Sequence, residues 1–312
     1  MASQRDHGGG LDAAIKTFGG SRAEWLDLST GINPVPYPFP ALSADAWTAL
    51  PDTQMAADLT QAARTFWHVP ESAEILAAPG ASALIAQIPR LAAPATVSIP
   101  APTYNEHAAS FAQHDWQVHS EGAAQGQVLV HPNNPDGRMW SEQDLTTPLC
   151  IIDESFCDVA PDRSLIAHAA QPGRIVLKSF GKFWGLAGVR LGFAIGDPAL
   201  IARLRDMLGP WPVSGVALDI GARALNDPTW ADQTRSRLAA DTVRLDAMVC
   251  QHGAALLGGT TLFRLYRVDD ANAWQDRLAQ HHIWSRIFPY ADNWIRLGLP
   301  GPDGWDRLEA AL

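Results

Sequence analysis

The chain has 312 residues, of which 47% are hydrophobic and 18% charged, with a formal net charge of −10. This length suits one large α/β unit or two domains with a substantial core, and no run reaches the ~18 apolar residues that a membrane helix needs. The acidic balance and the lack of a basic run argue against nucleic acid as a partner, so local Arg and His side chains must hold any anionic small substrate.

The cysteines and the first residues bear on the compartment and on metal binding. Cys150, Cys157 and Cys250 are an odd number without paired spacing, which fits a reducing cytosol and argues against disulfides or a zinc site. The first ten residues contain no apolar block, so no secretory signal is indicated. We therefore expect a cytoplasmic protein without a metal site.

The N-terminal residues predict a short helix followed by an extended arm. His7-Gly-Gly-Gly precedes a helical pattern over 11–18, and a segment over 27–38 follows it. Four prolines between Pro34 and Pro40 exclude regular helix and favour extended backbone. A stiff exposed arm often carries binding groups. Without further information, His7 reads as a solvated terminal histidine.

The next elements form a strand, a turn and a helix start. An amphipathic helix is predicted over 53–69, a strand over 74–78 and a helix over 83–91. The turn Pro79–Ser82 between the last two places free backbone N–H groups at a helix N-terminus, which favours anion binding. Ser82 is expected to cap the helix. Capping alone is the alternative interpretation of this turn.

Three further strands are predicted over 95–99, 127–131 and from residue 149 to a pair of carboxylates, Asp153 and Glu154. A charge at the end of so apolar a strand should be paired. Strands alternate with helical patterns from 74 to 195, which predicts an α/β unit with a mostly parallel sheet and helices on both faces.

The stretch 175–195 carries the strongest chemical signal. Two apolar runs enclose a loop with a Ser, several Gly, Lys182 and Arg190. Of the three lysines, Lys16 and Lys178 lack these surroundings. An amine able to form a Schiff base beside a fork-shaped cation suited to phosphate is what a pyridoxal phosphate (PLP) enzyme needs. The alternative is an ordinary surface Lys in a glycine loop.

The remaining residues predict a smaller C-terminal domain. Helical patterns dominate over 198–252, and the longest, 230–251, bridges into this domain. Strands are expected over 260–268, 284–288 and 294–298, with helices over 271–281 and 305–312. We predict an N-terminal arm over 1–40, a large domain over 41–228 and a small α+β domain over 229–312.

Two motifs carry a family resemblance. Ser179-Phe-Gly-Lys182 followed by Gly188-Val-Arg190-Leu-Gly192 resembles the Lys loop of fold-type I PLP enzymes, the aspartate aminotransferase superfamily. The N-terminal H-G-G and D-L-S-T-G-I-N-P resemble the threonine-phosphate decarboxylases of cobalamin biosynthesis. The resemblance implies the fold-type I architecture, a large mostly parallel-sheet domain with a smaller α+β domain, and PLP as the cofactor.

The resemblance also implies roles for individual residues. Lys182 forms the Schiff base, Asp153 pairs with the pyridine nitrogen, and Tyr104 stacks on the ring. Asn134 of Pro-Asn-Asn-Pro bonds the phenolic oxygen. The other implied contacts are with the cofactor (Ala81, Ser82, Ser179, Arg190) and with the substrate (His7 and Arg286 toward its phosphate, Arg296 toward its α-carboxylate, Asn33 from the arm). Tyr packed at a helix start, and Arg on a surface strand, are the bland alternatives.

Three positions depart from the pattern of the wider superfamily. Gly181 replaces a hydroxyl residue that helps to hold the cofactor phosphate. Leu50 stands where related aminotransferases carry a Tyr that reaches the neighbouring subunit. Phe156 stands where most aminotransferases have a Tyr that donates to the phenolic oxygen, and Phe is typical of the decarboxylase group.

The leading hypothesis is decarboxylation of L-threonine O-3-phosphate to aminopropanol phosphate through a Schiff base on Lys182. An aminotransferase of a phosphorylated amino acid, similar to histidinol-phosphate aminotransferase, is the second, since the same residues support both reactions. A PLP-fold binding or assembly protein is the third. The resemblance also implies a homodimer that binds a small phosphorylated amino acid, and no membrane or nucleic-acid partner.

Overall fold

The computed structural model describes residues 7–39 and 41–312, and it separates into two compact units. Unit 1 joins the residues up to Val35, the turn Pro135–Gly137 and Gln233–Leu312. Unit 2 comprises Pro36–Asn134 and Arg138–Asp232. Most of the predicted N-terminal arm, up to Val35, thus belongs to the same unit as the C-terminal residues. The predicted boundary at 228/229 lies near the observed division at 232/233, inside the helix α8 (Pro228–Gln251).

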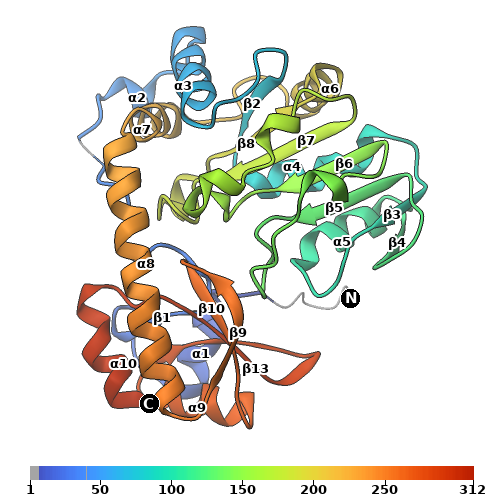
Figure 1. Cartoon of the computed structure of the whole chain (residues 1–312). Coiled ribbons are helices and arrows are strands. Elements are labelled where there is room, and N and C mark those ends of the chain that lie inside the picture. The colour runs from blue at the N-terminus through green and yellow to red at the C-terminus, as the bar shows by residue number, and fades with distance from the viewer. Residues whose placement is uncertain (1–6, 40) are drawn as a thin grey trace. The chain divides into compact units, whose positions relative to one another are not determined.

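Unit 2 is built on a seven-stranded sheet (Figure 1) with the order β2-β8-β7-β6-β5-β3-β4. The strands are β2 (Glu74–Ala78), β3 (Thr96–Ser98), β4 (Gln117–His119), β5 (Gly126–Val130), β6 (Leu149–Asp153), β7 (Arg174–Ser179) and β8 (Gly192–Gly196). Strand β8 runs antiparallel to β2 and β7, and all other neighbours are parallel. The predicted mostly parallel sheet is therefore confirmed.

The central strands are buried because their sequences are continuously apolar. Every residue of β5, β6 and β8 is buried, as expected for strands covered on both faces. Side chains such as Ile151 and Leu177 pack with Leu84 and Phe111 of the covering helices in one cluster. The helices are α2 (Asp45–Thr48), α3 (Thr53–Phe66), α4 (Ala81–Gln87), α5 (Asn105–Gln113), α6 (Pro198–Leu208) and α7 (Gly215–Leu225).

One predicted helix cap is wrong. Helix α4 begins at Ala81, and its N-cap is Gly80 with a φ of 84° and no side-chain cap bond. Ser82 therefore lies within the first turn, exposed to solvent. Gly80 takes this place because its positive φ suits glycine and because a Cβ there would collide with the guanidinium of Arg190.

Unit 1 contains a four-stranded antiparallel sheet of order β12-β13-β10-β9 and a parallel pair, β1 with β11. Its elements are α1 (Leu11–Phe18), β1 (Leu26–Asp27), β9 (Ala255–Thr260), β10 (Phe263–Arg267), α9 (Ala271–Gln280), β11 (Ile283–Trp284), β12 (Arg286–Phe288), β13 (Ala291–Gly298) and α10 (Trp305–Ala311). The strand predicted over 260–268 corresponds to β10, whereas β9 is not predicted; a turn at residues 261–262 separates the two. Gly258 and Gly259 hide β9 from the sequence pattern, because glycine is disfavoured in strands.

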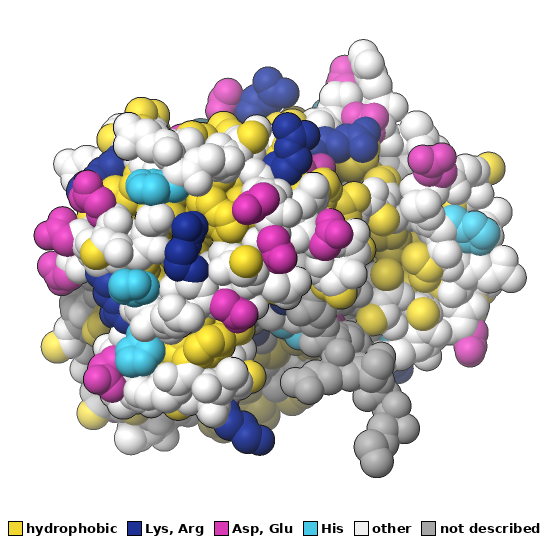
Figure 2. Space-filling model, turned by 90° about the horizontal axis from the view of Figure 1, so that it is seen from below, with side chains coloured by type: hydrophobic (Ala, Val, Ile, Leu, Met, Phe, Trp, Pro, Cys, Tyr) yellow, Lys and Arg dark blue, Asp and Glu magenta, His cyan; other side chains and the backbone are white. Residues whose placement is uncertain are grey.

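Two surface properties bear on partners. Among the described residues, no helix has both the length and the apolar character required to cross a bilayer. On the face drawn in Figure 2, acidic side chains lie among the Lys and Arg side chains. This mixture agrees with the net negative charge of the chain.

Candidate active site

Three predicted cofactor residues meet at one edge of the unit 2 sheet. The strand register aligns Val130, Asp153 and Leu177 on the neighbouring strands β5, β6 and β7. Asn134 follows the end of β5, Asp153 ends β6, and Lys182 follows the end of β7. Since these strands are parallel, their carboxyl ends share one edge, which is where α/β sheets bind ligands.

Asp153 is buried and held by hydrogen bonds. Its Oδ2 lies 2.8 Å from Nε2 of His107, and its Oδ1 accepts from the backbone N–H (3.0 Å) and hydroxyl (2.6 Å) of Ser155. Burial acts to raise the pKa of Asp153, but the bonds from His107 and Ser155 together outweigh it, and the pKa is lowered. The carboxylate is therefore ionised and fixed in direction, as a partner of a protonated ring nitrogen must be.

Aromatic side chains lie beside two residues of the site, His107 and Lys182. Tyr104 precedes α5, and its ring meets that of His107 edge to face, with centroids 6.0 Å apart. Nζ of Lys182 lies 5.1 Å from the ring centroid of Phe156. Sequence reasoning missed His107. Its only signal is that it stands three residues after Tyr104, one turn along the same helix.

The predicted phosphate residues converge around β8. Gly192 pairs with Ala78 of β2 on one side and with Ser179 of β7 on the other. A Cβ at Gly192 would collide with the backbone N of Ala81, so the start of α4 approaches the strand closely.

Arg190 completes this group. Its backbone is left-handed, with a φ of 55°, and its guanidinium lies against Gly80. A helix N-terminus beside a guanidinium and the hydroxyl of Ser179 is a suitable set of donors for a phosphate. The residues present thus fit both the phosphate and the ring of the cofactor that the resemblance implies.

The predicted substrate arginines are neighbours in unit 1. Arg286 of β12 stands directly opposite Arg296 of β13 in the antiparallel register. Arg296 is buried, donates to the backbone oxygen of Ser29 and lies 5.0 Å from the ring centroid of Phe263. Burial, followed by repulsion from Arg286, lowers the pKa of Arg296 to about 9. The positive charge is thus less favourable here than in water, and an anion bound beside the pair would stabilise it.

Ser29, which sequence reasoning missed, connects the N-terminal motif to these arginines. Its hydroxyl accepts from the backbone N–H of Gly9 at 2.7 Å and donates to Asp27 at 2.6 Å. A Cβ at Gly8 would collide with the same backbone oxygen that accepts from Arg296. The glycines after His7 therefore permit a contact that brings the start of the chain to β13, and His7 itself is exposed.

Asn33 is buried, and its side-chain oxygen has partners within unit 1. It accepts from Nη2 of Arg237 at 2.6 Å and from the backbone N–H of Val35 at 3.1 Å. The bond from Arg237 holds this segment against α8. The predicted contact of Asn33 with the substrate stays a prediction. Because the side-chain oxygen is engaged, the side-chain NH2 group would have to make this contact.

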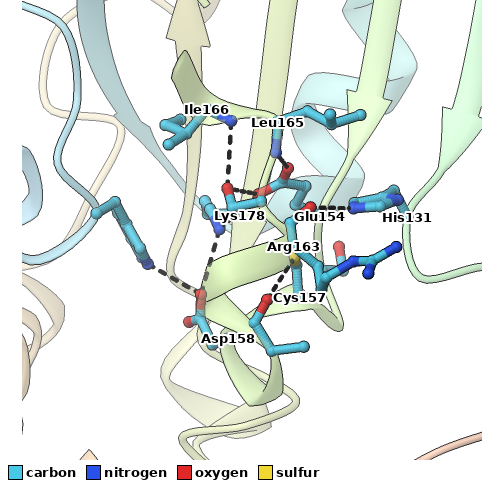
Figure 3. Close-up of polar contacts among 12 residues, drawn as sticks. His131, Glu154, Cys157, Asp158, Arg163, Leu165, Ile166 and Lys178 are labelled. Atoms are coloured by element: carbon cyan, nitrogen blue, oxygen red, sulfur yellow. Dashed lines mark hydrogen bonds and ion pairs between the residues drawn. The ribbon is translucent and has the colours of Figure 1, made fainter. Parts of the chain in front are cut away.

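One group of side chains in the described residues has ligand atoms close enough together for a metal. Ligand atoms of His131, Glu154 and Cys157 lie within 4.8 Å of one another. However, Nδ1 of His131 accepts from the backbone N–H of Trp140 at 2.9 Å, and Nε2 lies 2.7 Å from the backbone oxygen of Arg163. Burial also raises the pKa of the Cys157 thiol. These groups are engaged with the protein (Figure 3), so we assign them a structural role.

Comparisons with known proteins agree with this geometry. A family model described as aminotransferase class I and II matches residues 24–120 and 119–306. The chain is 37% identical to a threonine-phosphate decarboxylase of Pseudomonas aeruginosa, over 98% of this chain and 97% of the relative. It is 38% identical to one of Sinorhizobium sp, over 100% and 98%.

A solved structure is similar in fold. The histidinol-phosphate aminotransferase of Sinorhizobium meliloti, solved in complex with pyridoxal-5'-phosphate, has a TM-score of 0.83 and 22% identity, and covers 99% of this chain and 94% of its own. At this identity the likeness bears on the fold alone, and the fold is that of fold-type I.

Proposed function

Since the chain belongs to the aminotransferase class I and II family, we propose that it is a PLP-dependent enzyme that decarboxylates L-threonine O-3-phosphate to aminopropanol phosphate in cobalamin biosynthesis. The observation that carries the choice of reaction is the full-length match to two threonine-phosphate decarboxylases. The observation that carries the cofactor is the sheet edge that gathers Asp153, Lys182 and the Gly80–Arg190 cradle.

The chain's residues divide the work as follows. PLP, when bound, supplies an electron sink for a bond at the substrate's Cα. Asp153 presents an ionised carboxylate, held by His107 and Ser155, to the ring nitrogen. Lys182 would hold the cofactor through its Nζ, and the same amino group, when free, would give a proton to the substrate's Cα. Phe156 forms an apolar wall beside it.

The substrate carries two anionic groups, a carboxylate and a phosphate, and unit 1 offers two arginines on neighbouring strands. Arg296 is the proposed partner of the carboxylate, because a fixed guanidinium binds a carboxylate through two parallel bonds. Arg286 and His7 are the proposed partners of the phosphate. How the carboxylate is held decides which bond at Cα is weakened, so Arg296 decides between loss of CO2 and loss of a proton.

The test is CO2 release from threonine phosphate by the purified, PLP-loaded protein without any 2-oxo acid. Lys182→Ala should lower the rate of CO2 release by at least about 10³-fold. The exposed Lys16 provides the matched control, and Lys16→Ala should retain full activity. Borohydride trapping followed by mass spectrometry should place the cofactor adduct on Lys182. An adduct on another side chain, or none, contradicts the proposal.

The alternative is an aminotransferase of a phosphorylated amino acid, which the fold likeness to a histidinol-phosphate aminotransferase supports. The same assay separates the two functions. Activity that depends on an added 2-oxo acid and releases no CO2 would establish the alternative and exclude the decarboxylase.

The proposal includes a cytoplasmic homodimer. Phe39 and Trp47 are exposed to 66% and 70%, and both line an apolar pocket of ≈ 770 Å³ next to Leu186 and Val189 of the Lys182 loop. Large exposed aromatic side chains around one apolar hollow are typical of a protein interface. Light scattering after gel filtration should give twice the chain mass, and Trp47→Glu should give the monomer. A monomeric wild-type protein would contradict the dimer.

A further inference from the structure

A buried charge network lies directly behind the candidate site in unit 2. Lys178 of β7 is 2% exposed, Glu154 is 1% and Asp158 is 4%. Nζ of Lys178 lies 2.7 Å from Oε2 of Glu154 and 3.3 Å from Oδ1 of Asp158. Figure 3 shows both carboxylates turned toward this ammonium group. One buried cation is thus shared between two carboxylates from the segment after β6.

Neutral donors complete the network. Glu154 accepts from the hydroxyl of Ser164 and from the backbone N–H of Leu165, both at 2.6 Å. Asp158 accepts from two indole N–H groups, that of Trp67 on Oδ1 at 2.9 Å and that of Trp184 on Oδ2 at 3.0 Å. These hydrogen bonds offset the cost of burying two carboxylates beside a single cation. Burial acts to lower the pKa of Lys178, but the two carboxylates prevail and raise it.

Trp184 connects this network to the catalytic loop. It stands two residues after Lys182, and its side chain is fully buried. Its indole stacks between Phe180 and Trp230, with centroid distances of 5.2 and 5.3 Å and interplanar angles of 11° and 14°. Its backbone oxygen accepts from the N–H of Tyr37 at 2.9 Å. The ring therefore cannot turn without breaking the bond to Asp158.

The other end of the network is equally close to the chemistry. Glu154 directly follows Asp153, and Asp158 lies in the short turn after it. Lys178 precedes the Lys182 loop on β7. The path from Asp153 through Glu154, Lys178 and Asp158 to Trp184 thus joins the proposed partner of the ring nitrogen to the loop that carries Lys182.

We propose that Lys178, Asp158 and Trp184 are positioning residues, which fix the position of the Lys182 amino group relative to the Asp153 carboxylate. The inference rests on the proposed function, because it concerns how that site is held. Through its bond to Asp158, the indole N–H of Trp184 holds the Lys182 loop to the segment that follows β6. A purely structural role would require only that the space be filled.

Unit 2 contains a matched pair of variants for the test. Trp184→Phe and Trp67→Phe each remove one indole N–H from the same carboxylate, and both indoles are buried. Only Trp184 belongs to the Lys182 loop, whereas Trp67 directly follows the last residue of α3. Both variants should therefore lower the melting temperature to a similar extent. If the two variants then differ in activity, the cause is the position of the Lys182 loop and not a general loss of stability.

Three readouts separate the roles. In Trp184→Phe loaded with PLP, the fraction of bound cofactor that is trapped on Lys182 by borohydride should fall at least about twofold. Its kcat should fall about tenfold or more with little change in KM, because a small misplacement of a catalytic group is costly. Hydrogen exchange of residues 182–190 should quicken even without cofactor. Trp67→Phe should match the wild type in all three.

Equal behaviour of the two variants in trapping and kcat would overturn the proposal. Asp158→Asn keeps the shape of the network but removes one charge, so it should reduce trapping as Trp184→Phe does; wild-type trapping in this variant would also overturn it. Failure of the proposed function looks different, since the wild-type protein itself would then show no adduct on Lys182, while faster exchange of the loop in Trp184→Phe alone would still be measurable.

Discussion

The charged side chains of the candidate site have different surroundings in the two units. In unit 2 the buried carboxylates each face protein donors: Asp153 faces His107 and Ser155, and Asp158 faces Lys178 and two indoles. In unit 1 two guanidiniums, those of Arg286 and Arg296, stand opposite each other on neighbouring strands and repel.

The difference indicates which ligand each unit serves. A site whose charges are neutralised by its own side chains is organised before any ligand arrives, which suits a cofactor that stays bound. A site in which like charges face each other gains most when an anion binds, which suits a substrate that comes and goes. We therefore expect the buried charges around Asp158 to contribute to stability, and the Arg286–Arg296 pair to contribute to the affinity for the proposed substrate.

The largest effect is expected from removing the buried cation of unit 2. Lys178→Met leaves two carboxylates buried without their counter-charge, so unfolding should become easier by about 3–5 kcal/mol. Chemical denaturation of the purified protein measures this. A loss below about 1 kcal/mol would show that unit 2 does not depend on its internal neutralisation.

The next effect concerns Asp153. Asp153→Asn removes the proposed ionised partner of the ring nitrogen, so kcat should fall about 10²–10³-fold while the protein still folds. Because the pKa of Asp153 is lowered in the folded protein, its contribution to stability is present above its ordinary value of 3.8 and is lost as the pH falls through the lower folded-state value. The variant's unfolding free energy should accordingly vary less with pH below about pH 4. An unchanged kcat would show that Asp153 has no role in catalysis.

The arginine pair of unit 1 provides the third prediction. Arg296→Lys keeps the charge but loses the two proposed parallel bonds to a carboxylate, so KM for threonine phosphate should rise about tenfold. Arg286→Lys is the matched control, because a phosphate accepts a point charge readily, and its KM should change less. A KM that rises equally in both variants would contradict the separate roles.

The smallest effect should come from Gly181. A Cβ there would lie 3.4 Å from Cα of Ala187, an ordinary contact, and the residue does not have a positive φ. Gly181→Ser should therefore fold normally and gain about 0.4–1 kcal/mol of stability from a less flexible unfolded chain. The new hydroxyl should strengthen PLP binding about threefold or more. Equilibrium dialysis measures the affinity, and weaker binding would mean that no phosphate lies beside residue 181.

Much of unit 2 can be predicted from the sequence because its signals are local. Continuous apolar runs mark buried strands, and glycines mark the turns after them, so the strand–turn–helix at Gly80 and the Lys182 loop are recognisable without the structure. The histidine partner of Asp153 is not, because a histidine on the first turn of a helix carries no sign of the strand it will face. Lys178 gives no signal for the same reason: its partners, Glu154 and Asp158, come from another strand end.

In unit 1 the prediction is weaker because the relevant contacts join distant parts of the chain. Arg296 is selected by resemblance, but Ser29, whose backbone oxygen it meets, lies 267 positions away. Gly258 and Gly259 weaken the strand pattern of β9, so the sequence predicts only the second strand of the β9–β10 hairpin. Close backbone approaches such as those at Gly8 and Gly258 are visible only when both partners are placed.

The pairing of Gly192 with both Ala78 and Ser179 has a consequence for biosynthesis. Strand β8 is the last of its sheet to leave the ribosome, yet it separates the first strand, β2, from β7. A nascent chain that ends before about residue 196 thus lacks the piece that joins Ala81 to Arg190, and β2 has no neighbour. The close approach of Gly80 to Arg190 can therefore form only after nearly two thirds of the polypeptide has been translated. A chain that ends earlier would have an open sheet edge that is exposed to aggregation.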